Sequence, residues 1–478
     1  TTFITVTTSA GSVWCVRMDT GVARALSHAH PTPVNFIGIT KVGLRNALLT
    51  CTDDGAGRVW DCVSGSKTIE TYGKLDGNRF GDNTCVVSAA SPCGSCIVFG
   101  REDGSISVVE TKYDDRRKSS NDSKTSCSVA ASDPYTFTPH PDGGAVICCA
   151  FVESIFGSHD VGYSNTQTLY VKSVHNLLTV SSDGSVCVTE FGSVADENTG
   201  EIKTETKTNT LVVGGPGNVR PVLAASVEVG VTPTRVALAR RDGIIVVSVA
   251  EGVNGKYAAA VSFEYAPESF VTNYSLKESA EGTCSINVTG GDMNRAVVAW
   301  SSTNAGVLFY ASAVTNFSLV VLDTKNTNDD ETVVVCLDSI RGEGIHGEGV
   351  QEGIQDRNQS GNNRGHYNLS CLSVAGSDSG TGDLLAIGTG NGVVFCEIKA
   401  RDTAGFAFPK NVDSTPNAFG HRTIVPKKTK TWHSATGKPV RAVAWQIDES
   451  LTQDIHDITK TTAWVAAGED VHAFENVF

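Results

Sequence analysis

The stretch ALLTCTDDGAGRVWDCV, residues 47–63, contains two apolar runs separated by a polar turn with Asp54-Gly55 at its end. β-Branched and aromatic residues favour extended backbone on both sides of that turn. Glycine readily adopts the positive φ that tight hairpin turns require. The stretch therefore predicts two antiparallel strands joined directly by a short turn.

The same pattern returns along the chain in eight units, each with two apolar runs around a polar turn. The chain has 48 glycines, about one residue in ten, whereas glycine usage averages about 7%. In the last unit Glu469-Asp470 stand where the other units have glycine. The remaining turns are marked by Gly11, Gly55, Gly104, Gly184, Gly243, Gly306 and Gly392.

A further β-type run precedes most of these hairpins, and a more polar run follows them. PVNFIGIT (33–40) and CSINVTG (284–290) are preceding runs, while KTIETYG (67–73) and SLVVLDT (318–324) are following runs. Four strands per unit, repeated along a chain, are typical of the blades of a β-propeller. Helical periodicity is nearly absent, which excludes a helical solenoid and argues against a multi-domain α/β enzyme. The sequence predicts an all-β fold.

Residues 50–61, TCTDDGAGRVWD, match the WD-repeat signature over its whole length, and the chain resembles the WD-repeat (WD40) propeller family. The other units match less closely, with the tryptophan replaced. The resemblance implies a structural brace of hydrogen-bonded side chains in this blade. Its histidine would be His28 or His30 and its hydroxyl Thr50 or Thr52. We assign the brace to His30, Thr52, Asp54 and Trp60.

The number of expected strands lies between the numbers that seven and eight blades require. The first unit lacks a first strand and the last unit lacks a fourth. Seven blades, with one terminal strand completing the final blade, is our prediction for a single propeller domain spanning 1–478. Eight blades, or an open ring completed by a partner's strand, are the alternatives.

Several units are longer than the 40–45 residues of a bare repeat, which predicts inserted loops. We place these at about 111–135, 192–210, 323–366 and 400–435; the last contains the basic segment 422–430. Long loops on a rigid scaffold commonly carry function. The candidate partner-binding residues, on these loops and on the hairpin turns, are Arg101, Arg240, Arg241, Asp242, Lys427, Lys428 and Trp432.

The composition limits the function classes. The net charge of −14 argues against a general nucleic-acid or anionic-membrane binder. Cys93 and Cys96 form the one Cys-x-x-Cys pair, but no second such pair accompanies them as a zinc site requires. We therefore expect no metal, no cofactor and no catalytic residues. Without a leader-like or membrane-spanning stretch, the default location is a reducing, cytoplasmic one.

These observations predict a non-enzymatic protein-interaction scaffold, a subunit of a large intracellular assembly whose other proteins are its partners. Two alternatives belong to other classes. The chain could be an RNA-associated subunit that uses the basic 422–430 segment. It could also be a propeller enzyme with an active site in the central channel. That site needs charged residues on the first strands, and PVNFIGIT and AVICCAF (145–151) offer almost none.

Overall fold

The structure is a computed structural model of the chain. It describes the strands and most of the short turns between them. The described residues are 3–7, 13–17, 23–42, 45–61, 67–72, 84–92, 94–113, 129–131, 134–141, 144–152, 174–195, 202–211, 221–228, 230–240, 243–252, 257–265, 295–312, 319–325, 333–335, 369–376, 382–390, 392–399, 422–424, 428–433, 439–448 and 460–475.

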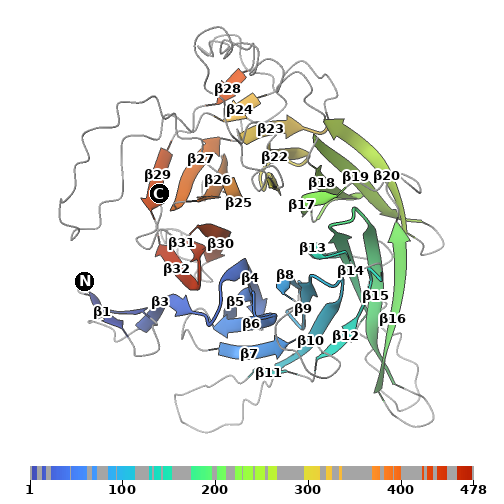
Figure 1. Ribbon diagram of the computed structural model, residues 1–478, viewed down its shortest axis with the longest axis horizontal. Helices are drawn as coiled ribbons and strands as arrows, with labels where there is room; N and C mark the ends of the chain where they lie inside the picture. The colour runs from blue at the N-terminus through green and yellow to red at the C-terminus, as the bar shows by residue number, and fades with distance from the viewer. Residues whose placement is uncertain are drawn as a thin grey trace, which may run out of the picture.

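The described strands form seven sheets around one axis, antiparallel except for one added strand, and we call them blades A to G (Figure 1). Blade A contains β4 (Val34–Val42), β5 (Arg45–Thr52), β6 (Ala56–Asp61) and β7 (Lys67–Tyr72). Blade B contains β8 (Cys85–Ala90), β9 (Cys96–Arg101) and β10 (Ile106–Tyr113), with β11 (Val129–Ala131) and β12 (Tyr135–Phe137) sharing the outer edge of β10. Blade C contains β13 (Val146–Val152), β14 (Val174–Ser181), β15 (Val186–Ala195) and β16 (Ile202–Leu211).

The remaining blades complete the ring. Blade D contains β17 (Val222–Glu228), β18 (Thr234–Arg240), β19 (Gly243–Glu251) and β20 (Tyr257–Tyr265). Blade E contains β21 (Ala296–Trp300), β22 (Val307–Ser312), β23 (Leu319–Asp323), β24 (Val333–Val335) and the added β28 (Arg422–Ile424). Blade F contains β25 (Leu369–Gly376), β26 (Gly382–Thr389), β27 (Gly392–Lys399) and β29 (Lys428–His433). Blade G contains β30 (Val440–Asp448), β31 (Lys460–Ala467), β32 (Asp470–Glu475) and β3 (Ala23–Ala29), extended by β2 (Val13–Arg17) and β1 (Phe3–Thr7).

The predicted seven-bladed β-propeller is confirmed. The first strand of each blade contacts the first strand of the next, and β30 of blade G contacts β4 of blade A, so the ring is closed. β3, near the N-terminus, pairs with β32, near the C-terminus, as the fourth strand of blade G. The fourth strand that the last unit lacked thus comes from the first unit.

The apolar core lies between neighbouring blades. One cluster joins Phe309 of blade E to Leu385 of blade F, and others repeat this arrangement around the ring. Between blades A and B, Phe99 packs so closely on Gly57 that a Cβ atom there would lie 2.2 Å from the ring. Because both faces of the inner strands are buried in this way, these strands read as continuous apolar runs.

Two units are arranged differently from the prediction. The first hairpin, β1–β2, lies outside β3 as an addition to blade G. In blade E the turn at Gly306 joins the first strand to the second, and SLVVLDT contains the third strand, β23. CSINVTG lies outside the described residues. The last hairpin also has its glycine after all, since Gly468, with φ of +66°, precedes Glu469.

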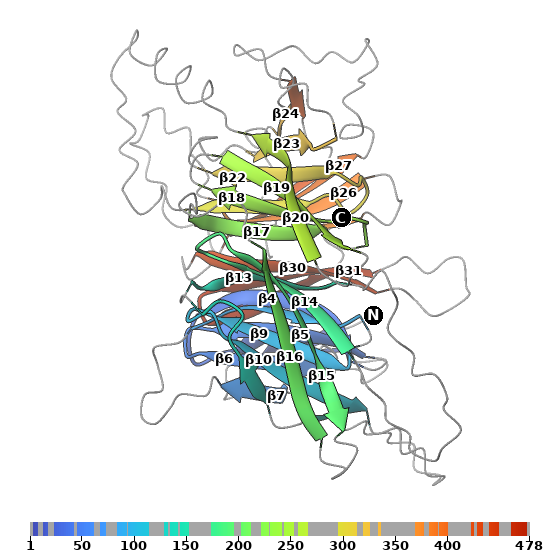
Figure 2. The ribbon, with the colours of Figure 1, turned by 90° about the vertical axis from the view of Figure 1, so that its right-hand side faces the viewer.

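The predicted loop at 192–210 is largely a hairpin, because β15 and β16 pair over their full lengths. Its sequence is polar because β16 is an outer strand. In the predicted 400–435 loop, 428–433 form β29, the fourth strand of blade F, while β28 adds in parallel to the edge of blade E. The rest of that loop, and most of 111–135 and 323–366, lie outside the described residues. Figure 2 shows the ring from the side.

Candidate functional site

One face of the propeller carries the turns between second and third strands together with the starts of the first strands. We call it the turn face. In blade A it holds the start of β4 and the Asp53-Asp54-Gly55 turn, because Val34 pairs with Thr52 at this end of the sheet. From the sequence, we placed some of the candidate partner-binding residues on these hairpin turns.

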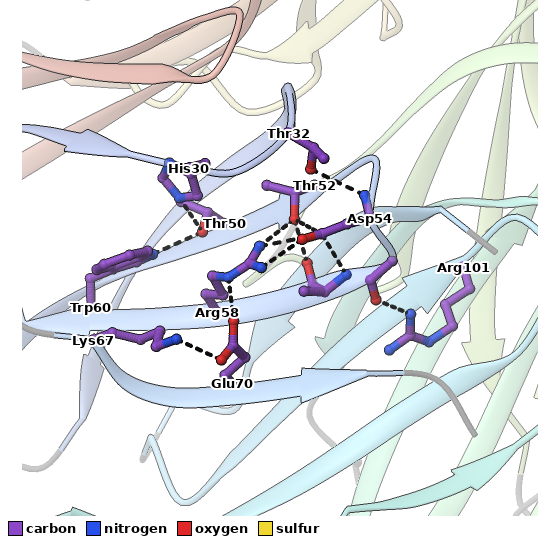
Figure 3. A network of polar contacts seen from close by, with 12 residues as sticks. His30, Thr32, Thr50, Thr52, Asp54, Arg58, Trp60, Lys67, Glu70 and Arg101 are labelled. Atoms are coloured by element: carbon purple, nitrogen blue, oxygen red, sulfur yellow. Dashed lines mark hydrogen bonds and ion pairs between the residues drawn. The ribbon is translucent and has the colours of Figure 1, made fainter. Parts of the chain in front are cut away.

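The brace of blade A is built on Thr50 (Figure 3). The Thr50 hydroxyl lies 3.1 Å from His30 Nε2 and accepts a hydrogen bond of 2.9 Å from Trp60 Nε1. Thr52, which we had assigned to the brace, instead donates to Asp54 Oδ1 at 2.5 Å. The network thus has two parts, one around the His30 ring and one around the Asp54 carboxylate.

Asp54 is the centre of a charged group in which Arg58 bridges two carboxylates. Arg58 Nη2 lies 2.7 Å from Asp54 Oδ2, and Arg58 Nε lies 2.7 Å from Glu70 Oε1. Burial alone would raise the pKa of Asp54, but hydrogen bonds from Arg58 and Thr52 outweigh it and lower that pKa. Because its charges are paired within the blade, this group stabilises the turn.

Blade C contains a second histidine brace that the sequence analysis missed. His140 Nε2 lies 2.9 Å from Thr179 Oγ1, and His140 Nδ1 lies 2.8 Å from Ser185 Oγ. Burial lowers the pKa of His140 to about 4, so the imidazole is neutral near pH 7. The signal was present, because His140-Pro141 precedes the first strand of blade C as His30-Pro31 precedes that of blade A.

Two of the three predicted partner-binding arginines, Arg101 and Arg240, are buried. Arg101 is fully buried, with Nη1 donating to the Gly55 carbonyl and Nε 3.3 Å from Ser107 Oγ. Arg101 stands where blade A has Thr52, and Ser107 where blade A has Arg58, so the two blades exchange the cation and the hydroxyl. Arg240 is also buried. Neither guanidinium is therefore available to a partner.

Of the other predicted residues, the structure describes Lys428 and Trp432. Lys428 and Trp432 belong to β29, and the half-buried Trp432 ring packs against His472 and Phe474 of blade G. Arg241, Asp242 and Lys427 lie outside the described residues.

A feature not anticipated from the sequence recurs at the start of the first strands. In six of the seven blades the pairing of the first strand with the second slips at the same place, the second residue of the strand. Such bulges re-aim a side chain and are frequent next to functional sites. Because the first strands are the innermost, these residues surround the ring axis on the turn face. This bulge ring consists of Asn35, Val86, Ile147, Leu223, Ser370 and Arg441.

The bulge ring has an apolar arc in blades B, C and D. Its members Val86, Ile147 and Leu223 are partly exposed. Partly exposed aliphatic side chains on a fixed backbone can contact a partner without reorganisation. A sequence signal exists for some of the ring, since Pro-Val precedes the bulged residue in blades A, D and G.

The other half of the bulge ring is polar and links blades F, G and A. Ser370 Oγ donates to the Val440 carbonyl in the next blade. Arg441 Nη1 donates to Asn35 Oδ1 and lies 3.0 Å from Asp53 Oδ2. The Arg441 and Asp53 side chains remain 41% and 38% exposed. Their charges are therefore paired but still accessible from the turn face.

Within the described residues, no three His, Cys, Asp or Glu side chains come close enough together to hold a metal ion. Cys96 is a buried thiol that forms no disulfide, and Cys93 lies outside the described residues. The described part of the chain contains no helix of the length and apolarity that crossing a bilayer requires.

No family model and no curated protein matches this chain. Among solved structures, it is similar to one described as the structure of U3-55K, with 12% sequence identity and a TM-score of 0.45. That similarity covers 94% of this chain and 98% of the other. It is also similar to the crystal structure of RRP9 WD40 repeats, with 12% identity, a TM-score of 0.43, and coverage of 93% and 97%.

Proposed function

We propose that this propeller is a non-enzymatic protein-interaction scaffold that binds a partner polypeptide across the bulge ring on its turn face. The observation that supports this most directly is the repetition of one bulge in six blades. It sets partly exposed side chains of two chemical kinds around one axis. The closed ring holds their backbones in place, so little conformational entropy is lost on binding.

The two arcs fit a partner segment with an apolar side chain and a nearby carboxylate. The apolar side chain would be desolvated against Val86, Ile147 and Leu223, as the central anchor of an interface is. The carboxylate would compete with Asp53 for the Arg441 guanidinium, which charge-assisted hydrogen bonding favours. Membership of a multi-subunit assembly and a cytoplasmic location remain proposals that accompany this one.

The test compares proteins captured by tagged wild-type chain, by Ile147→Asp/Leu223→Asp and by Arg441→Glu, with quantitative mass spectrometry. Thr206→Lys is the control, because Thr206 is exposed on β16, an outer strand. We expect the same stoichiometric partners to be lost from both ring variants and kept by the control. Circular dichroism melting confirms that the variants fold. Partners that are unchanged in both ring variants would refute the proposed site.

A further inference from the structure

The outer strands of the blades differ in how their free edges are protected. An outer strand presents a row of backbone N–H and C=O groups to which another strand can pair. β28 covers β24 in blade E, and β2 and β1 cover β3 in blade G. β7, β16 and β29 instead carry Lys67, Lys207 and Lys430. Lysine on an edge strand discourages pairing, because the pair would have to accommodate its charge.

β20 has neither form of protection. Its nine residues, YAAAVSFEY, include no lysine, arginine or proline, and within the described residues no strand lies on its outer side. Val261, at its middle, is 52% exposed and is the one exposed large apolar side chain in the described part of the chain. Among the outer strands of blades A, C, D and F, as far as the structure describes them, β20 is the one with neither a covering strand nor a lysine.

A bulge limits the part of β20 that can pair regularly. The register against β19 shifts between Val261 and Phe263, and the extra residue, Ser262, donates from Oγ to the Val246 carbonyl. Before the bulge, Tyr257 and Ala259 pack on the cluster shared with blade C, and after it Phe263 packs on the cluster shared with blade E. The regular edge is therefore the segment from Tyr257 to Val261.

We propose that this segment pairs with itself in a second copy of the chain, antiparallel and about a two-fold axis at Ala259. In that register each Tyr257 faces the other copy's Val261, and Ala258 faces Ala260. Aromatic and β-branched residues directly opposite one another form favourable cross-strand pairs. By symmetry, the pairing covers Val261 of both copies, and the interface is isologous and closed. It is independent of the bulge ring.

The charges of the chain set how this dimer responds to salt. Each copy carries a net charge of −14, so two copies repel at long range. Within the edge, however, Tyr257 to Val261 carry no charge, and Glu264 lies beyond the bulge, outside the paired segment. Salt screens the repulsion without weakening the backbone pairing. Dimerisation should therefore strengthen from low to physiological ionic strength.

The first experiment is sedimentation velocity of the full chain between about 5 and 200 µM, a range suited to a small interface. We expect a concentration-dependent dimer that Val261→Lys weakens at least tenfold. The matched control, Thr206→Lys, adds the same charge to the outer strand of the neighbouring blade and should leave the dimer intact. Thermal melting of both variants excludes a folding defect as the cause.

The second experiment tests the register. Directly opposed residues of paired strands lie close enough for a disulfide. Oxidation with copper-phenanthroline should therefore cross-link Ala259→Cys into a dimer on a non-reducing gel, and Ala258→Cys far less.

Three results would overturn the proposal: a chain that stays monomeric at the highest concentration, a dimer that persists in Val261→Lys, or equal cross-linking at the two cysteine positions. A monomer whose 257–261 amides resist hydrogen exchange would show that a segment of the same chain covers the edge, and would also overturn it.

Discussion

Blades A and C hold a histidine in the same place by different means. In blade A, Thr50 joins His30 to the indole of Trp60, so the brace extends to the third strand. In blade C, Thr179 occupies the position of Thr50 and meets His140 in the same way. The histidine–threonine contact is therefore common to a blade with the WD signature and to one without it.

The difference lies in what replaces the tryptophan. Thr189 takes the position of Trp60 and pairs with Thr208 of the outer strand at 3.1 Å. The second nitrogen of His140 turns instead toward Ser185, whose backbone N–H donates to Asp183 Oδ1 at 2.7 Å. The comparison teaches that a brace depends on the register of the first two strands, while its third-strand partner can change.

The largest expected effect comes from giving blade A the residue that blade C has. Trp60→Thr removes the hydrogen bond to Thr50 and most of the indole's packing, including its edge contact with the His30 ring. We expect a loss of about 3 kcal/mol of unfolding free energy, as for other large core truncations. Urea unfolding monitored by circular dichroism measures it. A loss below about 1 kcal/mol would show that the threonine of blade C is an equivalent solution.

The second prediction concerns the pH dependence that His140 gives to stability. The pKa of His140 is about 4 in the folded chain, and its reference value is 6.5. Between pH 4 and pH 6.5 the unfolded chain therefore binds the proton more readily than the folded chain does. Stability from this group is present above pH 6.5 and is lost as pH falls toward 4. Between pH 7 and pH 5 the contribution of His140 to the free energy of unfolding falls by about 2 kcal/mol.

Urea unfolding of wild type and His140→Gln at both pH values measures this difference. Other titrating groups, such as His175 and His472, contribute equally to the two proteins and cancel. The same pH slope in both proteins would contradict the prediction.

A smaller loss of unfolding free energy is expected from Arg58→Met, a substitution in the charged group beside the turn of blade A. The change leaves Asp54 and Glu70 without their bridging cation, but both carboxylates are partly exposed and can be hydrated. We expect a loss of about 1–2 kcal/mol. The pKa of Asp54 should also rise, because the Arg58 contact is one cause that lowers it. Carboxyl titration by NMR measures that shift, and an unchanged pKa would argue against the bridge.

The smallest effect is expected from Ser185→Ala. It removes the hydroxyl that holds His140 Nδ1, while the Thr179 contact remains. We expect a loss of about 1 kcal/mol, the usual contribution of one hydrogen bond. Thr189→Ser, which keeps its hydroxyl, is the matched control. A larger loss than for Trp60→Thr would reverse the order of importance of the two braces.

The repeated hairpin turns made the fold predictable, because the apolar runs and the turn glycines are local signals. The choice between Thr50 and Thr52 was not local. Thr50 and Thr52 are two residues apart on one strand, so their side chains lie on the same face of the sheet. Only the position of His30 selects Thr50 as the partner of its ring. The burial of Arg101 was equally hidden, since an arginine beside an Asp-Gly turn reads as exposed until a neighbouring blade covers it.

The bulge ring could not be read from any single blade. A bulge is a feature of how two strands align, and the residues it displaces range from Val86 to Arg441 with no shared chemistry. Likewise, 192–210 read as a loop because an outer strand has one wet face and little apolar pattern. In both cases the missing information was the pairing partner.

The junction of β3 with β32 has a kinetic consequence. Ser27, His28 and Ala29 pair with His472, Val471 and Asp470, so three residue pairs join the two ends of the chain. Bringing ends so far apart in sequence together costs about 5 kcal/mol of chain entropy. During synthesis, blade A therefore cannot pack against blade G until the strands of blade G have been made. Ring closure should be the late, slow event of folding, and the seam between blades G and A the first place to open.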